Sequence, residues 1–214
     1  MALLLFCVVL LGCGSGAGPN IASSPVDQPT GGETLETITL GISMYRLVGD
    51  YDEPDPAISS QRTEEELLEI VARMNDIWAP AGIRLEAKTM PTIKLPKELL
   101  ARVAYGEIRA LLQELGESVE PPGPGVINGF YTRSLEGPNG IAFPARGIFM
   151  FTDEPSVFDR RVSSHELGHI LGLPHTPTDP GRLLFSGTNG MDLTDNEITI
   201  SRIMASELLE SPSN

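Results

Sequence analysis

Apolar and polar residues alternate from Thr37 to Tyr45, a period of two that predicts a first β-strand. Further along, Thr63 and Glu66 have the spacing of a capping box, which predicts the start of a helix. Pro80 and Gly82 end that helix. Its apolar positions recur at helical spacing, and we expect them in the core: Leu67, Ile70, Val71, Met74 and Trp78.

The rest of the chain alternates between short apolar runs and helical patterns. Strands are expected at 83–87, 126–131 and 147–151, and helices at 99–115 and 160–171. A second capping box, at 194–197, predicts a last helix that runs to about residue 209. With no internal repeat, this order predicts one mixed α/β domain over residues 34–214.

The chain begins with an apolar segment, Ala2 to Leu11, which is too short to span a membrane. The run Leu10-Leu11-Gly12-Cys13 resembles the end of bacterial lipoprotein signal peptides. That resemblance implies a signal peptide over residues 1–12, cleavage before Cys13 and lipidation of this cysteine. The expected location is the bacterial cell envelope, with the membrane as a partner through the lipid anchor. No Lys or Arg precedes the apolar run, so an ordinary secretory signal and a secreted protein are the alternative.

Residues 13–33 are rich in Gly, Ser, Pro and Thr without periodicity, which predicts a flexible tether. Such a segment is too short for a folded inhibitory propeptide. Cys7 and Cys13 are the only cysteines, so the folded part has no disulfide and no thiol ligand. Any metal site in it must use histidines and carboxylates.

Chain length and net charge limit the number of domains and the classes of binding partner. The 214 residues suffice for one sizeable core, and we expect a monomer. A net charge of −14 argues against nucleic acid as a partner. The acidic turn from Gly49 to Asp55 is interpreted as a solvated loop, and a calcium site there has no further support.

The strongest chemical signal is the pattern H-E-x-x-H-x-x-G-x-x-H, formed by His165, Glu166, His169, Gly172 and His175. Residues four apart share a helix face, so the first two histidines can bind one ion, and the glycine lets the chain turn back to bring the third. Three protein ligands leave a position for water, as in catalytic zinc sites. The glutamate can then act as the general base on zinc-bound water.

Two other interpretations also fit this segment. The short form H-E-x-x-H can arise by chance on a polar helix. Ser163 and Glu166 also have the spacing of a capping box, which would be a purely structural role. However, the chain has only three histidines, and each occupies a ligand position of the long motif. This coincidence favours a zinc site.

The segment from His165 to His175 resembles the active site of metzincin zinc peptidases, and more narrowly that of matrixins. The segment 179–185 resembles the loop that runs into the family's Met-turn, and the segment 193–198 resembles the start of the family's last helix. The resemblance implies a twisted mixed sheet with an active-site helix and a C-terminal helix. It also implies zinc on the three histidines, Glu166 as the base, and hydrolysis of peptide bonds in extracytoplasmic proteins.

This sequence departs from the family pattern in two places. Leu184 stands where the Met-turn methionine is expected, and it should support the site, as Gly172 does, at a cost below about 1.5 kcal/mol. Pro177 adds one residue after the third histidine, and Thr176 replaces a residue that often marks a subfamily. These departures leave the subfamily open.

The resemblance further suggests a substrate-binding edge strand made of Gly140, Ile141, Ala142 and Phe143, to which a peptide could add as a strand. A plain loop between Pro138 and Pro144 is the alternative. Residues 186–192 would form the wall of a substrate pocket. Two alternatives to a peptidase stay open, namely a zinc-binding lipoprotein of the same fold with little activity, and an enzyme that hydrolyses a non-peptide amide.

Overall fold

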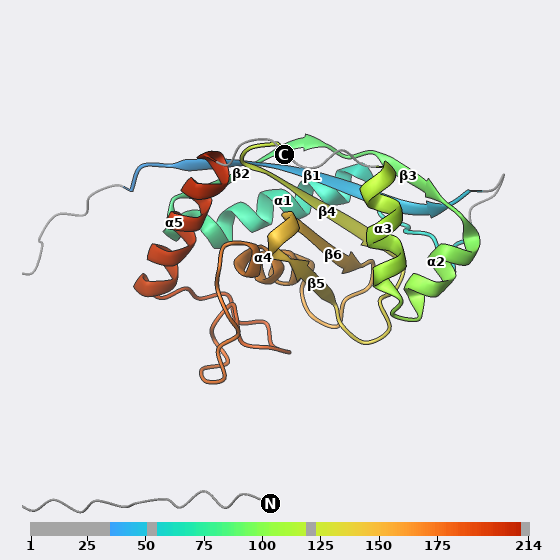
Figure 1. Ribbon diagram of the computed structural model, residues 1–214. Coiled ribbons are helices and arrows are strands. Elements are labelled where there is room, and N and C mark those ends of the chain that lie inside the picture. The colour runs from blue at the N-terminus through green and yellow to red at the C-terminus, as the bar shows by residue number, and fades with distance from the viewer. Residues whose placement is uncertain (1–34, 51–54, 119–122, 211–214) are drawn as a thin grey trace, which may run out of the picture. The chain divides into compact units, whose positions relative to one another are not determined.

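The computed structural model describes residues 35–50, 55–118 and 123–210 (Figure 1). The predicted signal peptide, Cys13 and the tether to residue 33 lie outside the described residues, so these assignments stay predictions. Most of the acidic turn, at 51–54, is also outside them. In the part of the chain that is described, no helix has the length and apolar character needed to cross a membrane.

The centre of the domain is a six-stranded sheet with the order β2-β1-β4-β6-β5, and β3 pairs with the far half of β1. The strands are β1 (Ile38–Gly49), β2 (Ile83–Thr89), β3 (Thr92–Leu95), β4 (Val126–Thr132), β5 (Gly140–Phe143) and β6 (Ile148–Thr152). All pairs are parallel except β5 with β6, which is antiparallel. The mixed α/β class predicted from the sequence is therefore confirmed.

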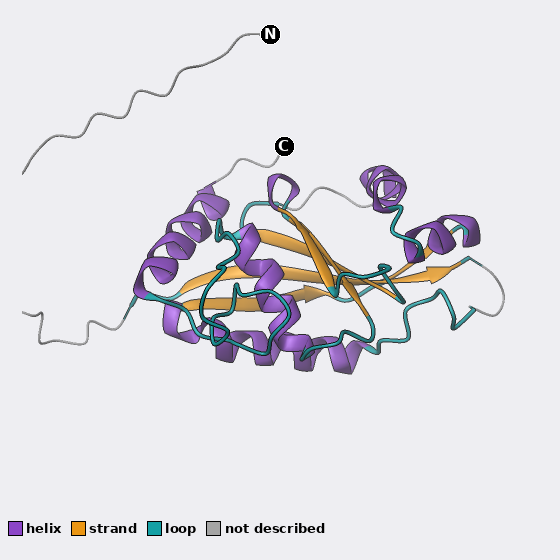
Figure 2. Ribbon diagram, turned by 90° about the horizontal axis from the view of Figure 1, so that it is seen from below, coloured by secondary structure: helices purple, strands orange, loops and turns teal. Residues whose placement is uncertain are grey.

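Helices flank both faces of this sheet (Figure 2). They are α1 (Glu64–Trp78), α2 (Lys97–Ala104), α3 (Ile108–Ser118), α4 (Asp159–Ile170) and α5 (Asp195–Glu210), with short 3₁₀ turns at Ala79–Ala81 and Pro144–Arg146. Along β6 the side chains alternate between two cores: Phe149 and Phe151 join the core of α1 and α4, whereas Met150 joins the core of α2 and α3. The central strands are thus buried on both faces.

Both predicted capping boxes are present. Thr63 and Glu66 exchange side-chain to backbone hydrogen bonds at the start of α1. Thr194 and Glu197 do the same before α5, at 3.0 and 3.3 Å. Each pair satisfies backbone N–H groups that a helix start leaves without partners. The two predicted helix starts are therefore confirmed.

The single helix expected at 99–115 is wrong. The structure has α2 and α3 instead, separated by a turn in which Gly106 has φ +83°. A side chain is strained in that left-handed conformation, so glycine permits the break. The apolar spacing continues across the break because Leu100, Val103 and Leu111 all reach the same core. Strand β3 was not predicted from the sequence.

Candidate metal centre

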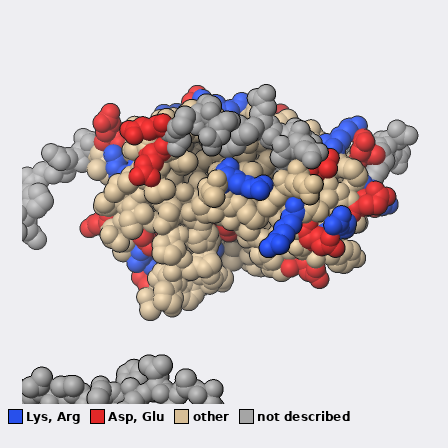
Figure 3. Space-filling model, viewed as in Figure 1, with Lys and Arg blue, Asp and Glu red and all other residues tan. Residues whose placement is uncertain are grey.

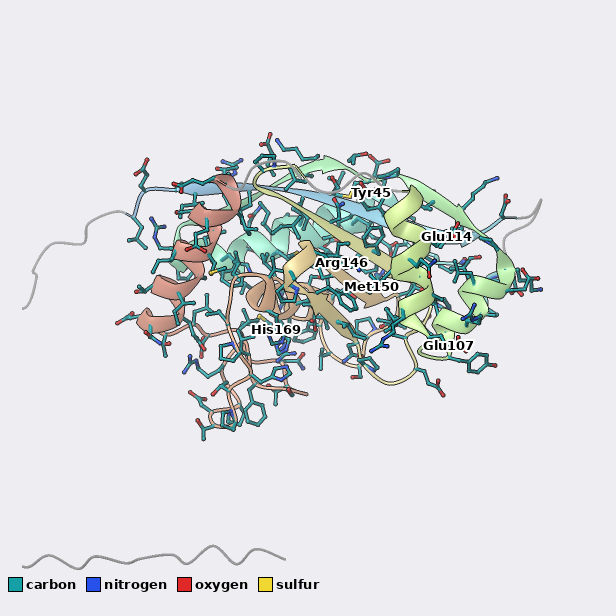
Figure 4. All side chains as sticks on the ribbon, viewed as in Figure 1. Tyr45, Glu107, Glu114, Arg146, Met150 and His169 are labelled. Carbon is teal, nitrogen blue, oxygen red and sulfur yellow. The ribbon has the colours of Figure 1, made fainter. Side chains whose placement is uncertain are left out.

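Helix α4 carries the first two histidines on one face. The helix ends at Ile170 and is capped by Leu171, and the next residue, Gly172, has a φ of +79° that turns the chain back toward the helix. The N–H of Leu173 then donates to the carbonyl of Gly168 at 2.9 Å. This turn brings His175 beside His165 and His169, and the three together form a group able to hold a metal ion. Figure 4 labels His169, which lies below α4 in that view.

The three Nε2 atoms meet at one point. Each pair among His165, His169 and His175 is separated by 3.1 Å. A tetrahedral zinc with Zn–N bonds of about 2.0–2.1 Å would hold its nitrogens about 3.3 Å apart, so the spacing fits this ion. The ring environment fits as well, because Nδ1 of His165 lies 2.7 Å from the carbonyl of Leu183 and Nδ1 of His169 lies 2.8 Å from that of Leu173. A carbonyl only accepts, so these Nδ1 atoms carry the protons and leave the Nε2 lone pairs free.

Electrostatics favours neutral rings at this point. Burial lowers the pKa of His165 to about 4, against a smaller opposing effect of the hydrogen bond to Leu183. Burial also lowers the pKa of His169. Only a neutral imidazole can bind a metal ion, so both ligands are ready for a cation at neutral pH.

Glu166 follows His165 on α4, and its side chain lies against Gly140 of the edge strand β5. Its side chain is buried, with 7% of the residue exposed. Desolvation raises the pKa of Glu166 to about 7, while the positive charge of Arg161 and a hydrogen bond from the backbone N–H of Ala142 oppose the rise. A carboxyl group with a pKa near neutrality can take up and return a proton at the working pH, as a general base requires.

The alternative role of Ser163 and Glu166 as a helix cap is wrong. Helix α4 begins at Asp159, so Ser163 lies inside the helix, and its Oγ is 3.2 Å from the hydroxyl of Tyr131. The carboxylate of Glu166 is directed toward β5 and accepts from Ala142. Glu166 is therefore free of any capping role.

The segment Gly140–Phe143 forms β5, the edge of the sheet, and the alternative of a plain loop is excluded. Its four residues are all partly exposed. A Cβ on Gly140 would lie 2.8 Å from Cγ of Glu166, so only glycine lets the strand lie this close to the carboxylate. Binding of a substrate by Gly140, Ile141, Ala142 and Phe143 stays a prediction.

Leu184 is fully buried and lies against α4 below the histidines. A Cβ on Gly168 would be 3.1 Å from Cδ2 of Leu184. The carbonyl of Leu184 accepts from the N–H of Thr176, next to the third histidine, at 3.0 Å. Met191 is only partly buried at the margin of the same core. The residue that packs against the active-site helix is thus Leu184 and not Met191.

One residue at this centre was missed from the sequence. Arg161 is a buried arginine, 4% exposed, one helical turn before His165 on α4. Its charge acts on Glu166, and its guanidinium contacts carbonyls of the segment that holds Leu184. The sequence feature that could have identified Arg161 is its position four residues before His165, because residues four apart lie on the same helix face.

Charge on the surface is uneven. On the face seen in Figure 3, acidic side chains gather toward the two ends, and the area between them is mostly neutral with a few Lys or Arg. The expectation that nucleic acid is not a partner stays a prediction from the net charge of −14.

Comparison with known proteins gives similarity of fold alone. No family model and no curated protein matches the chain. A solved chaperone–substrate complex matches with TM-score 0.51 and 13% identity over 83% of this chain and 36% of that one, so the chain spans about a third of its length. Archaemetzincin from Methanopyrus kandleri matches with TM-score 0.49 and 18% identity over 78% and 96% of the two chains. Metalloproteinase-II from Bacteroides fragilis matches with TM-score 0.46 and 12% identity over 80% and 55%. The chemistry is therefore inferred from the site itself.

Proposed function

We propose that this protein is a zinc-dependent metalloendopeptidase of metzincin-like, and more narrowly matrixin-like, type. The observation that carries the proposal is the meeting of three Nε2 atoms, 3.1 Å apart, at a helix that also carries the buried Glu166. When bound there, zinc supplies a Lewis acid that activates water and polarises a carbonyl. His165, His169 and His175 are its proposed ligands.

In this proposal Glu166 holds and moves the proton. The N–H of Ala142 donates to the carboxylate, and α4 carries Glu166 next to His165, so both the edge strand and the helix hold the base at the site. Glu166 accepts a proton from the attacking water and delivers it to the leaving amine. With zinc on the three histidines, the pKa of Glu166 would fall below its zinc-free value of about 7, and Glu166 would then be the ionised carboxylate that accepts the proton.

The proposed substrate is a protein or peptide in extended conformation. Strand β5 pairs with β6 on one side only, so its other side is a sheet edge to which an extended strand can add. Backbone pairing binds many sequences with little demand on side chains. An extended polypeptide fits this edge better than a small non-peptide amide, which has no strand to add.

Cleavage by the zinc-loaded chain tests the proposal. The full chain, stripped with a chelator and reloaded with one equivalent of zinc, should cut a mixture of denatured proteins and create new internal N-termini. Chelation should abolish cutting, and zinc should restore it. Zinc bound at one ion per chain without any new terminus would contradict the peptidase and favour the alternative of a zinc-binding protein.

We also propose an extracytoplasmic location with a lipid anchor on Cys13, supported by the run Leu10-Leu11-Gly12-Cys13. Expression in a bacterium with labelled palmitate should label the parent chain but not the Cys13→Ala variant. Cys7→Ala is the matched control, because Cys7 lies inside the apolar segment and should leave labelling intact. Label that persists in Cys13→Ala would refute the anchor.

A further inference from the structure

Arg161 is a buried cation without a carboxylate partner. Only 4% of the residue is exposed, and among the described residues no Asp or Glu lies within ion-pair distance of its guanidinium. Its Nε is buried without a hydrogen-bond partner. Burying a charge in this way is costly. A leucine or methionine would fill the same space without that cost, so the contacts of Arg161 require an explanation.

Among the described residues, the hydrogen bonds of the Arg161 guanidinium go to one short turn, residues 183–185. Its Nη2 donates to the carbonyl of Leu183 at 2.9 Å and, over a shorter distance, to the carbonyl of Phe185. The two carbonyls flank Leu184, the residue that packs under α4. The guanidinium thus holds both ends of this turn with one nitrogen.

The same turn contacts the proposed metal ligands. The carbonyl of Leu183 that accepts from Arg161 also accepts from Nδ1–H of His165, at 2.7 Å. The next carbonyl, that of Leu184, accepts from the N–H of Thr176, the residue after His175. Two of the three ligands are therefore oriented through the turn that the guanidinium holds.

We propose that Arg161 is a positioning residue for the metal site: by holding the carbonyl of Leu183, its guanidinium sets the orientation of His165 and so the affinity for zinc. This inference rests on the proposed zinc site. Partners that orient a ligating histidine from behind contribute strongly to metal affinity. Arg161 acts through a shared carbonyl and touches neither metal nor substrate.

The test compares zinc affinity in three full-length chains, measured by competition with a chromogenic chelator. Arg161→Met keeps the volume of the side chain and removes both donors. The matched control is Arg160→Met, because Arg160 is the neighbouring residue on α4, its replacement removes the same charge, and its guanidinium lies over the ring of Phe158. We expect the dissociation constant for zinc to rise roughly 10- to 100-fold in Arg161→Met and less than about twofold in the control.

A purely structural role would give a different result. It would lower the thermal midpoint of the zinc-free chain, while the folded protein, assayed well below that midpoint, would bind zinc as the parent does. Equal affinity in Arg161→Met and parent therefore overturns the proposal. The fluorescence of Trp78, the single tryptophan, shows whether each chain is folded at the assay temperature.

Arg161→Lys decides the question if Arg161→Met does not fold. Lysine keeps the charge, but its ammonium nitrogen ends one bond short of Nη2, the nitrogen of Arg161 that reaches both carbonyls. We expect at least a fivefold weaker zinc affinity in Arg161→Lys, and affinity equal to that of the parent would refute the proposal. Zinc affinity needs no substrate, so the result stands even if the parent chain cleaves no peptide. Failure of the peptidase proposal and failure of this one are therefore distinguishable.

Discussion

Leu184 is the residue whose replacement tests the packing under the metal site. It is fully buried, and its Cδ2 is 3.1 Å from the place where a Cβ on Gly168 would lie. Leu184→Ala removes three buried carbons, worth about 0.8 kcal/mol each, or about 2.4 kcal/mol in transfer free energy. The cavity adds to this cost, because the helix and the turn on either side cannot fully collapse. We expect a total loss of about 3–5 kcal/mol in the free energy of unfolding.

Chemical denaturation of the zinc-free chains measures that loss without the contribution of bound metal. Leu184→Met, which nearly conserves the volume, should cost less than about 1.5 kcal/mol. The matched control is Leu47→Ala, because Leu47 is equally buried but belongs to the core of α2 and α3.

Zinc affinity distinguishes the effect of Leu184→Ala from that of Leu47→Ala. Both alanine variants should be destabilised by similar amounts, but only Leu184→Ala should bind zinc more weakly, by roughly tenfold, because only this residue supports the turn behind His165. A loss below about 1 kcal/mol in Leu184→Ala, or zinc affinity reduced equally in Leu47→Ala, would refute the reasoning.

Three further predictions concern single residues. Thr63→Ala should lower the free energy of unfolding by about 1 kcal/mol through loss of the α1 cap, with zinc affinity unchanged. Gly172→Ala should cost about 2 kcal/mol and weaken zinc binding, because φ is +79° and the added Cβ would lie 2.9 Å from Cγ of Met204; an unchanged melting temperature would contradict this. The raised pKa of Glu166, about 7 against an ordinary 4.5, means that the folded, zinc-free state holds a proton that the unfolded state releases. Relative to Glu166→Gln, the zinc-free parent should therefore lose stability as pH rises from about 4.5 to 7, by up to about 1.4 kcal/mol per pH unit, and a parallel pH profile would refute it.

The sequence predicted most of the elements that local chemistry specifies. Capping boxes mark helix starts through side chains three residues apart, so Thr63 and Thr194 were identified directly. The histidine motif is equally local, because the helix period and one glycine bring its members together. Leu184 was placed in the site by resemblance, and its contact with α4 agrees with that placement.

The parts that were missed depend on contacts distant in sequence. The break at Gly106 was hidden because α2 and α3 bury their apolar residues in one core, which keeps the apolar spacing continuous. Strand β3 has four residues and is defined by its pairing with the far half of β1. The hydrogen bonds of Arg161 go to carbonyls 22 and 24 residues away, and no local sequence pattern indicates them.

The central claim is that Glu166 is the base of a zinc peptidase, and one measurement tests it most directly. Peptide cleavage is compared between the parent and Glu166→Gln at equal zinc content, with Glu98→Gln, an exposed carboxylate on α2, as the control. Both the parent and the control should cleave, whereas Glu166→Gln should retain about one zinc per chain and lose at least about 100-fold in rate. Zinc-loaded Glu166→Gln that cleaves as fast as the parent would contradict the account.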